Sequence, residues 1–277
     1  IVSNDIIQYI EPIIFTVDAR TITRVAQGRD LDNGVSINDE GSVAFSRLSG
    51  ANGGVYVSQG GREIRISHQG APFAQPVINN HGTVAFFAYS KQGTSIVTGN
   101  GGPLTTIVRD RTDAFPAFLA EQPGTLAFND KGTVAFISHL GNGQTGVIKA
   151  QDGTFSTIAG TNGPYVRFSK VALNNKGEVA FQADIPGPTP DNALTGIFTG
   201  PDPVANKVLA VGDPLFSSTV TQLSLWRDGL NDAGRIAFLA TLADGRQVIG
   251  RTTLTCPAAV KSQGKQPSDS SYLKLPF

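Results

Sequence analysis

Few residues of this chain have the types and spacing that chemistry requires. Its only histidines are His68, His81 and His139, and no His–His or His–Cys spacing of a zinc site relates them. His81 occupies a turn position at which related segments of the chain carry Glu, Lys and Ala, so we interpret it as a solvated turn residue. The sequence therefore predicts no metal site built on histidine.

Acidic residues gather in one inserted segment, where Asp110, Asp113 and Glu121 stand close together in sequence. A pair of carboxylates can act as acid and base in glycoside hydrolysis. Arg109 and Arg111 are mixed with these acids, which is typical of a solvated loop. Neither a Gly-x-Ser-x-Gly turn nor a phosphate-binding loop occurs in the sequence. We therefore predict no catalytic residues and no enzyme activity.

Five short segments offer oxygen atoms that calcium could bind. They are Asn38-Asp39, Asn79-Asn80, Asn129-Asp130, Asn174-Asn175 and Asn231-Asp232. Calcium loops gather several carboxylates at alternating positions, but two of these segments contain no carboxylate. We interpret all five as turns, and we expect neither a metal nor a cofactor.

Two features are better suited to binding a partner. Trp226, the only tryptophan, precedes Arg227, and tryptophan beside a polar group is typical of sugar and protein contacts. The second feature is the polar tail of residues 257–277, whose first part has the composition of a disordered segment. Near its end stand four large apolar or aromatic residues that we expect to anchor it on another chain, with the propeller's own surface as the alternative: Tyr272, Leu273, Leu275 and Phe277.

The composition excludes several classes of protein. Lys and Arg total 22 and Asp and Glu total 22, so the net charge is zero and no electrostatic footprint for nucleic acid is present. No apolar run is long enough for a transmembrane helix. Cys256 stands alone, so no internal disulfide can form, and we interpret it as a buried thiol, with a bond to another chain as the alternative. Because the chain starts at Ile1 and lacks methionine, we expect a processed chain, with removal of a signal peptide as one route.

The elements that must position these residues repeat five times along the chain. The repeated pattern is an apolar residue, Asn, Asp or Asn, any residue, Gly, any residue, Val or Ile, Ala, and Phe. The five copies span residues 37–45, 78–86, 128–136, 173–181 and 230–238. Their average spacing of about 48 residues is typical of a four-stranded propeller blade.

Each part of the pattern has a physical reason. Asn and Asp bond to nearby backbone and Gly accepts a positive φ angle, so Asn-x-x-Gly predicts a hairpin turn. Val43 and Phe45 then share one face of a strand, and Ala44 lies on the other. A strand that is apolar on both faces is covered on both sides, and we expect Phe to fill the gap to one neighbouring sheet while Ala allows the other to approach closely.

The strand before each Asn is predicted to be the innermost strand of its blade. Small residues stand two positions before Asn, where they would face a crowded axis. Mostly polar residues stand four positions before it, and we expect them to surround one mouth of an axial channel and to contact a partner or ligand. They are Gln75, Thr125, Lys170 and Arg227, with Gly34 in the first copy.

The sequence thus predicts an all-β fold, a single five-bladed propeller of four-stranded blades in residues 1–256. Residues 12–17 and 21–25 look like the last two strands of a repeat, whereas residues 247–254 supply only one strand after the fifth copy. We therefore expect both termini to close the ring, with the N-terminal segment completing the fifth blade. One strand, residues 13–17, is then in surplus, and six blades or another closed β-repeat ring is the alternative.

These repeats resemble the bacterial NxxGxxAF tandem-repeat family of exported or surface proteins with variable C-terminal anchors. The resemblance covers residues 12–254, and it implies a propeller-like fold and a periplasmic, extracellular or cell-surface location. It brings no activity, substrate or catalytic residues, and no sorting anchor follows in residues 257–277.

The predicted function is that of a non-enzymatic scaffold or accessory subunit. Its propeller faces and C-terminal tail would dock on other proteins. The alternative is a lectin-like propeller that binds glycans between its blades. A propeller hydrolase is disfavoured, because the predicted ring of small, uncharged residues offers no converging carboxylates.

Overall fold

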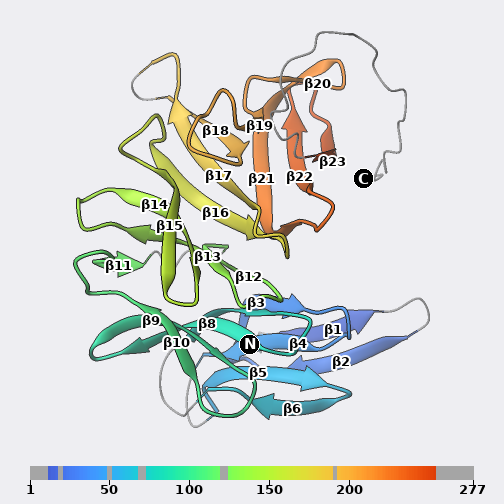
Figure 1. Cartoon of the computed structure of the whole chain (residues 1–277). Helices are drawn as coiled ribbons and strands as arrows, with labels where there is room; N and C mark the ends of the chain where they lie inside the picture. The colour runs from blue at the N-terminus through green and yellow to red at the C-terminus, as the bar shows by residue number, and fades with distance from the viewer. Residues whose placement is uncertain are drawn as a thin grey trace, which may run out of the picture. The chain divides into compact units, whose positions relative to one another are not determined.

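All regular elements in the structure are β-strands (Figure 1). The structure, a computed structural model, describes residues 12–17, 21–48, 52–67, 73–118, 124–189 and 192–253. The prediction of an all-β fold is confirmed. The chain divides into two compact units, of which the first comprises residues 1–91 and 97–105 and the second comprises residues 92–96 and 106–277.

The first unit contains a hairpin and two antiparallel sheets. The hairpin pairs β1 (Ile13–Val17) with β2 (Ile22–Gln27). The first sheet has the order β3 (Leu31–Ile37), β4 (Val43–Arg47), β5 (Gly54–Gln59) and β6 (Arg62–Arg65). The second sheet has the order β7 (Phe73–Ile78), β8 (Val84–Ser90), β9 (Gly93–Gly99) and β10 (Thr105–Arg109), and the division between the units crosses β9 and β10.

The second unit contains three antiparallel sheets. The third sheet consists of β11 (Ala117–Phe118), β12 (Leu126–Phe128), β13 (Val134–His139), β14 (Thr145–Gln151) and β15 (Thr154–Gly160). The fourth consists of β16 (Arg167–Leu173), β17 (Val179–Pro186), β18 (Ala193–Phe198) and β19 (Lys207–Ala210). The fifth consists of β20 (Pro214–Leu215), β21 (Ser218–Leu230), β22 (Arg235–Leu242) and β23 (Gln247–Thr253).

The predicted order of four successive antiparallel strands holds in the first, second and fourth sheets. In the third sheet two short strands, β11 and β12, both pair with β13. The strand before each Asn turn is the first strand of its repeat, and β3, β7, β12, β16 and β21 take this position. Inside the second unit the first strands β12, β16 and β21 contact one another, and inside the first unit β3 contacts β7. The sheets of each unit therefore fan out from their first strands.

The fifth sheet and the N-terminal hairpin lie in different units. The described strands of the fifth sheet have the order β20-β21-β22-β23 and come from residues 214–253. Strand β1 pairs with β2 in a two-stranded sheet, and closure of the ring by the N-terminal segment stays a prediction. The surplus strand therefore finds its partner locally, across a short connection whose closure loses little chain entropy. Ile14, Val25 and Ala26 of this hairpin pack with Leu31 and Phe45 of the first sheet.

The Val-Ala-Phe strands build the cores between neighbouring sheets of a unit. Three buried clusters each combine the motif Ala of one sheet with the motif Phe of the next. These pairs are Ala44 with Phe86, Ala135 with Phe181, and Ala180 with Phe238. The prediction that Phe packs toward one neighbouring sheet and Ala toward the other is therefore confirmed.

The fifth Val-Ala-Phe strand differs from the other four in its burial. Strands β4, β8, β13 and β17 begin with at least three buried residues in succession, so both of their faces are covered. Strand β22 instead alternates, with Ile236 and Phe238 buried and Ala237 exposed. One face of the fifth sheet is therefore packed and the other is exposed.

Candidate functional site

The first Asn of each repeat shapes its turn through its own side chain. In the fourth repeat, Asn174 Oδ1 accepts hydrogen bonds from the backbone N–H groups of Lys176 (3.1 Å) and Glu178 (3.0 Å). The same two bonds recur at Asn79, Asn129 and Asn231. Because N–H donors occupy this oxygen, it is not available to a cation, and the turn interpretation is the one that the geometry supports.

The same Asn also links its turn to the turn of the next sheet, which the sequence analysis missed. Asn38 Nδ2 donates to the carbonyl oxygen of Asn79 (3.1 Å). Asn129 donates in the same way to Asn174 (2.9 Å), and Asn174 donates to Asn231 (3.0 Å). A carboxamide supplies an acceptor and a donor together, whereas a carboxylate supplies only acceptors. The sequence did contain a signal for this second hydrogen bond, because the position is Asn, and never Asp, in all five copies.

The second turn position alternates between acid and amide along the chain. The five residues are Asp39, Asn80, Asp130, Asn175 and Asp232. Asn80 Nδ2 donates to Asp39 Oδ2 at 2.8 Å. Asn175 Nδ2 lies between two carboxylates, 2.8 Å from Asp130 Oδ2 and 3.0 Å from Asp232 Oδ2. Each of these contacts therefore joins one carboxylate to one carboxamide.

The predicted contact positions lie at irregular places in the first strands. Registers shift between residues 31 and 35 in β3, 74 and 77 in β7, 168 and 170 in β16, and 225 and 230 in β21. A β-bulge of this kind changes the direction of the side chains that it contains. The sequence located these positions but did not predict the bulges.

The predicted contact residues differ widely in exposure. Thr125 is fully buried and presents no surface to a partner. Lys170 is half-buried, and its aliphatic stem runs along Gly124. Gln75 lies in the irregular part of β7. Tyr272, Leu273, Leu275 and Phe277 lie outside the described residues, as do Cys256, His68 and Glu121.

Trp226 and Arg227 lie together in the bulge of β21. Trp226 is 48% exposed, whereas most of the Arg227 side chain is covered. Burial lowers the pKa of Arg227, and the nearby carboxylate of Asp228 partly offsets this effect. A Cβ atom on Gly229 would lie 2.8 Å from the carbonyl oxygen of Trp226, so only glycine fits there. At the other end of the bulge, the N–H of Leu225 donates to Gln182 Oε1 (2.9 Å). These contacts constrain the backbone on both sides of Trp226.

A row of side chains on the exposed face of the fifth sheet begins at Ser224, two positions before Trp226. Ser224 pairs with Leu239, which pairs with Ile249 on the outer strand. Trp226 lies just beyond this row, inside the bulge, and has no paired residue on β22. We call the exposed face of the sheet the open face, and it carries Gln222, Ser224, Ala237, Leu239, Thr241, Gln247, Ile249 and Arg251. Ile249 is 56% exposed, so the open face presents apolar groups among polar ones.

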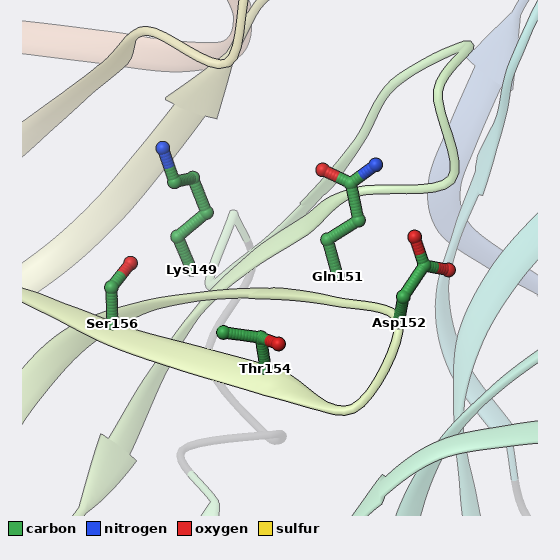
Figure 2. A pocket seen from close by; sticks show the side chains of 5 residues that line it. All are labelled: Lys149, Gln151, Asp152, Thr154 and Ser156. Carbon is green, nitrogen blue, oxygen red and sulfur yellow. The ribbon is translucent and has the colours of Figure 1, made fainter.

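A second candidate site is a pocket of about 330 Å³ on the hairpin of β14 and β15 (Figure 2). Its lining consists of Lys149, Gln151, Asp152, Thr154 and Ser156. Lys149 pairs with Ser156 across the hairpin, and Gln151 pairs with Thr154, so these four side chains share one face. The sequence analysis missed this pocket, although alternating polar residues on both sides of Asp152-Gly153 were a signal for it.

The residues first considered for catalysis serve the local structure. Asp110 Oδ1 accepts a hydrogen bond from the backbone N–H of Thr94 at 2.7 Å. His139 Nδ1 lies 3.3 Å from the hydroxyl of Thr145, on the next strand. Within the described ranges, no group of three or more His, Cys, Asp and Glu residues could hold a metal ion. The same ranges contain no helix that could cross a membrane.

Comparisons with known proteins relate the chain to a family and to several solved structures. The profile described as "Family of unknown function (DUF7453)" matches residues 51–250. No curated protein matches the chain. The resemblance to the NxxGxxAF family has no counterpart in these comparisons and stays a prediction.

Among solved structures, prolyl oligopeptidase B from Galerina marginata is 8% identical, with a TM-score of 0.52 over 85% of this chain and 34% of that one. Virginiamycin B lyase from Staphylococcus aureus is 14% identical, with a TM-score of 0.44 over 89% and 75% of the two chains. A putative gluconolactonase is 15% identical, with a TM-score of 0.43 over 83% and 78%. Together with the fanned antiparallel sheets, the first likeness supports a propeller-like all-β fold and brings no activity.

Proposed function

Since the chain belongs to DUF7453, a family of unknown function, membership brings no activity with it, and we propose that the chain is a non-enzymatic protein-interaction scaffold. In this proposal it acts as an accessory subunit of an exported or surface assembly. The observation that supports the proposal is the half-exposed Trp226, held in a bulge that only glycine can close. Tryptophan and arginine are among the residues most enriched at the energetic centres of protein interfaces.

The open face supplies the surroundings that such an anchor needs. Leu239 and Ile249 place apolar groups on the open face, in the row that begins at Ser224, two positions before Trp226. Gln222, Thr241 and Gln247 form a polar row beside them. An apolar centre with a polar rim is the usual anatomy of a protein interface. The partner in this proposal is therefore another protein chain that covers Trp226.

Three further parts of the proposal rest on the sequence. The five repeats favour a single closed propeller of five blades, and averaged electron-microscope projections would reveal the blade count. An open array or six blades would contradict it.

Export to the periplasm or cell surface follows from the resemblance to the NxxGxxAF family, and fractionation of cells that produce the protein checks it. Docking of the tail predicts that a chain without residues 258–277 loses its partner, and unchanged co-purification would count against that part.

The docking proposal is tested with Trp226→Ala in affinity purification from the source cells, followed by quantitative mass spectrometry. Loss of an interface tryptophan costs about 2 kcal/mol or more, so we expect about thirtyfold weaker binding of the partner. Val204→Ala is the matched control, because Val204 is 85% exposed on the loop between β18 and β19. A partner retained by the wild type and the control but lost by Trp226→Ala supports the proposal. Equal recovery with all three chains contradicts it.

A further inference from the structure

The pocket on the β14–β15 hairpin is made almost entirely of hydrogen-bonding groups. Lys149 contributes an ammonium group, Asp152 a carboxylate, Gln151 a carboxamide, and Thr154 and Ser156 contribute hydroxyls. Figure 2 shows these polar groups reaching toward the same side of the hairpin. Four of the five residues are exposed and Lys149 is half-buried, so the pocket is accessible from solvent. Its volume lies at the lower end of the range for small-molecule sites.

Contacts outside the pocket hold two of these side chains in place. Lys149 Nζ donates to the carbonyl oxygen of Gly177 (3.1 Å), in the turn of the fourth sheet. Gln151 Oε1 accepts a hydrogen bond from the hydroxyl of Thr133 (2.9 Å). Lys149 keeps two further N–H donors and Gln151 keeps part of its capacity as donor and acceptor. Side chains fixed in this way lose little rotamer entropy when a ligand binds.

The position of the pocket follows from the packing of the third sheet. Val147, Lys149 and Gln151 follow one another on the same face of β14. Val147 belongs to the buried core that the third and fourth sheets share, together with Phe181. The row of side chains therefore turns from apolar to polar where the shared core ends. The pocket begins where the packing between these two sheets stops.

The lining selects one class of ligand. One cation and one carboxylate make the pocket neutral, which disfavours a phosphate or sulfate group, because Asp152 would repel it. A single carboxylate is too few for a divalent cation. No aromatic side chain lines the pocket, so nothing there stacks on a nucleobase. The five polar side chains of the lining can donate hydrogen bonds, accept them, or do both. Such a lining suits a neutral ligand that is rich in hydroxyl groups.

We propose that this pocket binds a saccharide unit. The Asp152 carboxylate accepts hydrogen bonds from ligand hydroxyls, and the free N–H donors of Lys149 bond to ligand oxygens. Thr154 and Ser156 form the wall on the β15 side and bond to further hydroxyls. This site lies on the third sheet, whereas Trp226 lies on the fifth, so it is independent of the proposed protein docking.

Two variants test the site without touching the core. Asp152 lies at a φ of +49°, a conformation that asparagine accepts well, so Asp152→Asn removes the charge and preserves the hairpin turn. Ser156→Phe fills the pocket from an exposed position. Asp228→Asn makes the same charge change at an exposed carboxylate on β21 and serves as the control. Thermal unfolding curves check that all three variants fold like the wild type.

The experiment begins with a glycan array probed with the labelled wild-type chain, followed by titration of the best free saccharide by saturation-transfer NMR. We expect at least one saccharide to bind, about tenfold weaker binding by Asp152→Asn, and no detectable binding by Ser156→Phe. The control should bind like the wild type. Sodium phosphate at equal ionic strength should not compete.

Three results would overturn the proposal. An array without any bound saccharide removes the ligand class. A saccharide that binds both pocket variants as tightly as the wild type occupies another place on the chain. Phosphate that displaces the saccharide identifies an anion site instead. The Trp226→Ala experiment does not involve this pocket, so failure of either proposal leaves the other to its own test.

Discussion

The shared asparagine uses both ends of its carboxamide, which makes it the most constrained side chain of the repeat. Its oxygen orders the turn of its own sheet, and its nitrogen bonds to the next turn. The sequence predicted the first of these roles, because Asn before Gly is characteristic of a turn. It did not predict the second, since a bond between residues 57 positions apart depends on how two sheets pack.

Replacing Asn174 by Asp should therefore destabilise the fold. The variant loses the donor to Asn231 and places a carboxylate beside Glu178, whose Oε2 lies 2.6 Å from Asn174 Nδ2. We expect a loss of about 1–3 kcal/mol in the free energy of unfolding, measured by urea denaturation at neutral pH. Asn142→Asp makes the same chemical change in an exposed turn and should have little effect. Equal losses in both variants would contradict this role for Asn174.

Tyr165 links the stability of the second unit to alkaline pH. Burial raises its pKa, and Asp202 adds to the shift, while its hydroxyl donates to the carbonyl oxygen of Gly200 (2.7 Å). In the unfolded chain the pKa of tyrosine is about 10. The unfolded state therefore loses this proton first, so stability is intact below about pH 10 and falls as the pH rises further.

The matching variant is Tyr165→Phe, which lacks this proton. Below about pH 9 the wild type should be more stable by a constant margin, because it keeps the hydrogen bond to Gly200. Above about pH 10 the margin should shrink. Urea denaturation followed by circular dichroism at a series of pH values measures this difference in the free energy of unfolding. Parallel stability curves across the alkaline range would show that burial of the Tyr165 hydroxyl does not control this dependence.

The strand elements owe their different burial to their place in the array. Ala180 in β17 has no exposed surface and packs in the core that also contains Phe238 of the next sheet. Ala237 takes the same motif position in β22, but it lies on the open face. The sequence could not distinguish them, because both follow Val or Ile and precede Phe. The following sheet covers Ala180, whereas Ala237 is exposed among the described residues of the second unit.

Substitution by leucine should separate the two alanines. Ala180→Leu adds volume to a filled core, and we expect a loss of about 1–3 kcal/mol in the free energy of unfolding. Ala237→Leu places the same volume on an exposed face and should change stability by about 0.5 kcal/mol or less. Urea denaturation of both variants measures the difference. A large loss at Ala237 would show that the open face is covered in the folded chain.

The bulges of the first strands were beyond sequence prediction for a related reason. A bulge is a shift of register between two strands, and both strands keep an ordinary strand composition while it occurs. Gly229 was the exception, because a glycine inside a strand pattern signals a bulge or a close approach of backbone. The candidate contact Trp226 was therefore found by its residue type, whereas its place inside a bulge was not predicted.

At the scale of the whole molecule, repetition made the sheets predictable from the sequence, whereas the strand pairing of the terminal segments was difficult to predict. Five copies of one pattern located the five Asn-x-x-Gly turns and the strands that follow them, because each copy supported the interpretation of the others. Residues 13–17 have no such copy to compare with, and their pairing depends on competition between a nearby partner and a distant one. The nearby partner, β2, is the one that they take. Terminal segments of a repeat array are thus the parts that its pattern constrains least.

The alternation of acid and amide in the turns restricts how such an array can change its length. Asn175 separates Asp130 from Asp232, and its carboxamide bonds to both. Deleting the fourth repeat would remove both hydrogen bonds and set the two carboxylates against each other, and their repulsion would weaken the contact between the two turns. If two neighbouring repeats were lost or gained together, each turn carboxylate would still lie beside a turn carboxamide. Gene duplication can therefore lengthen this array most readily in even steps.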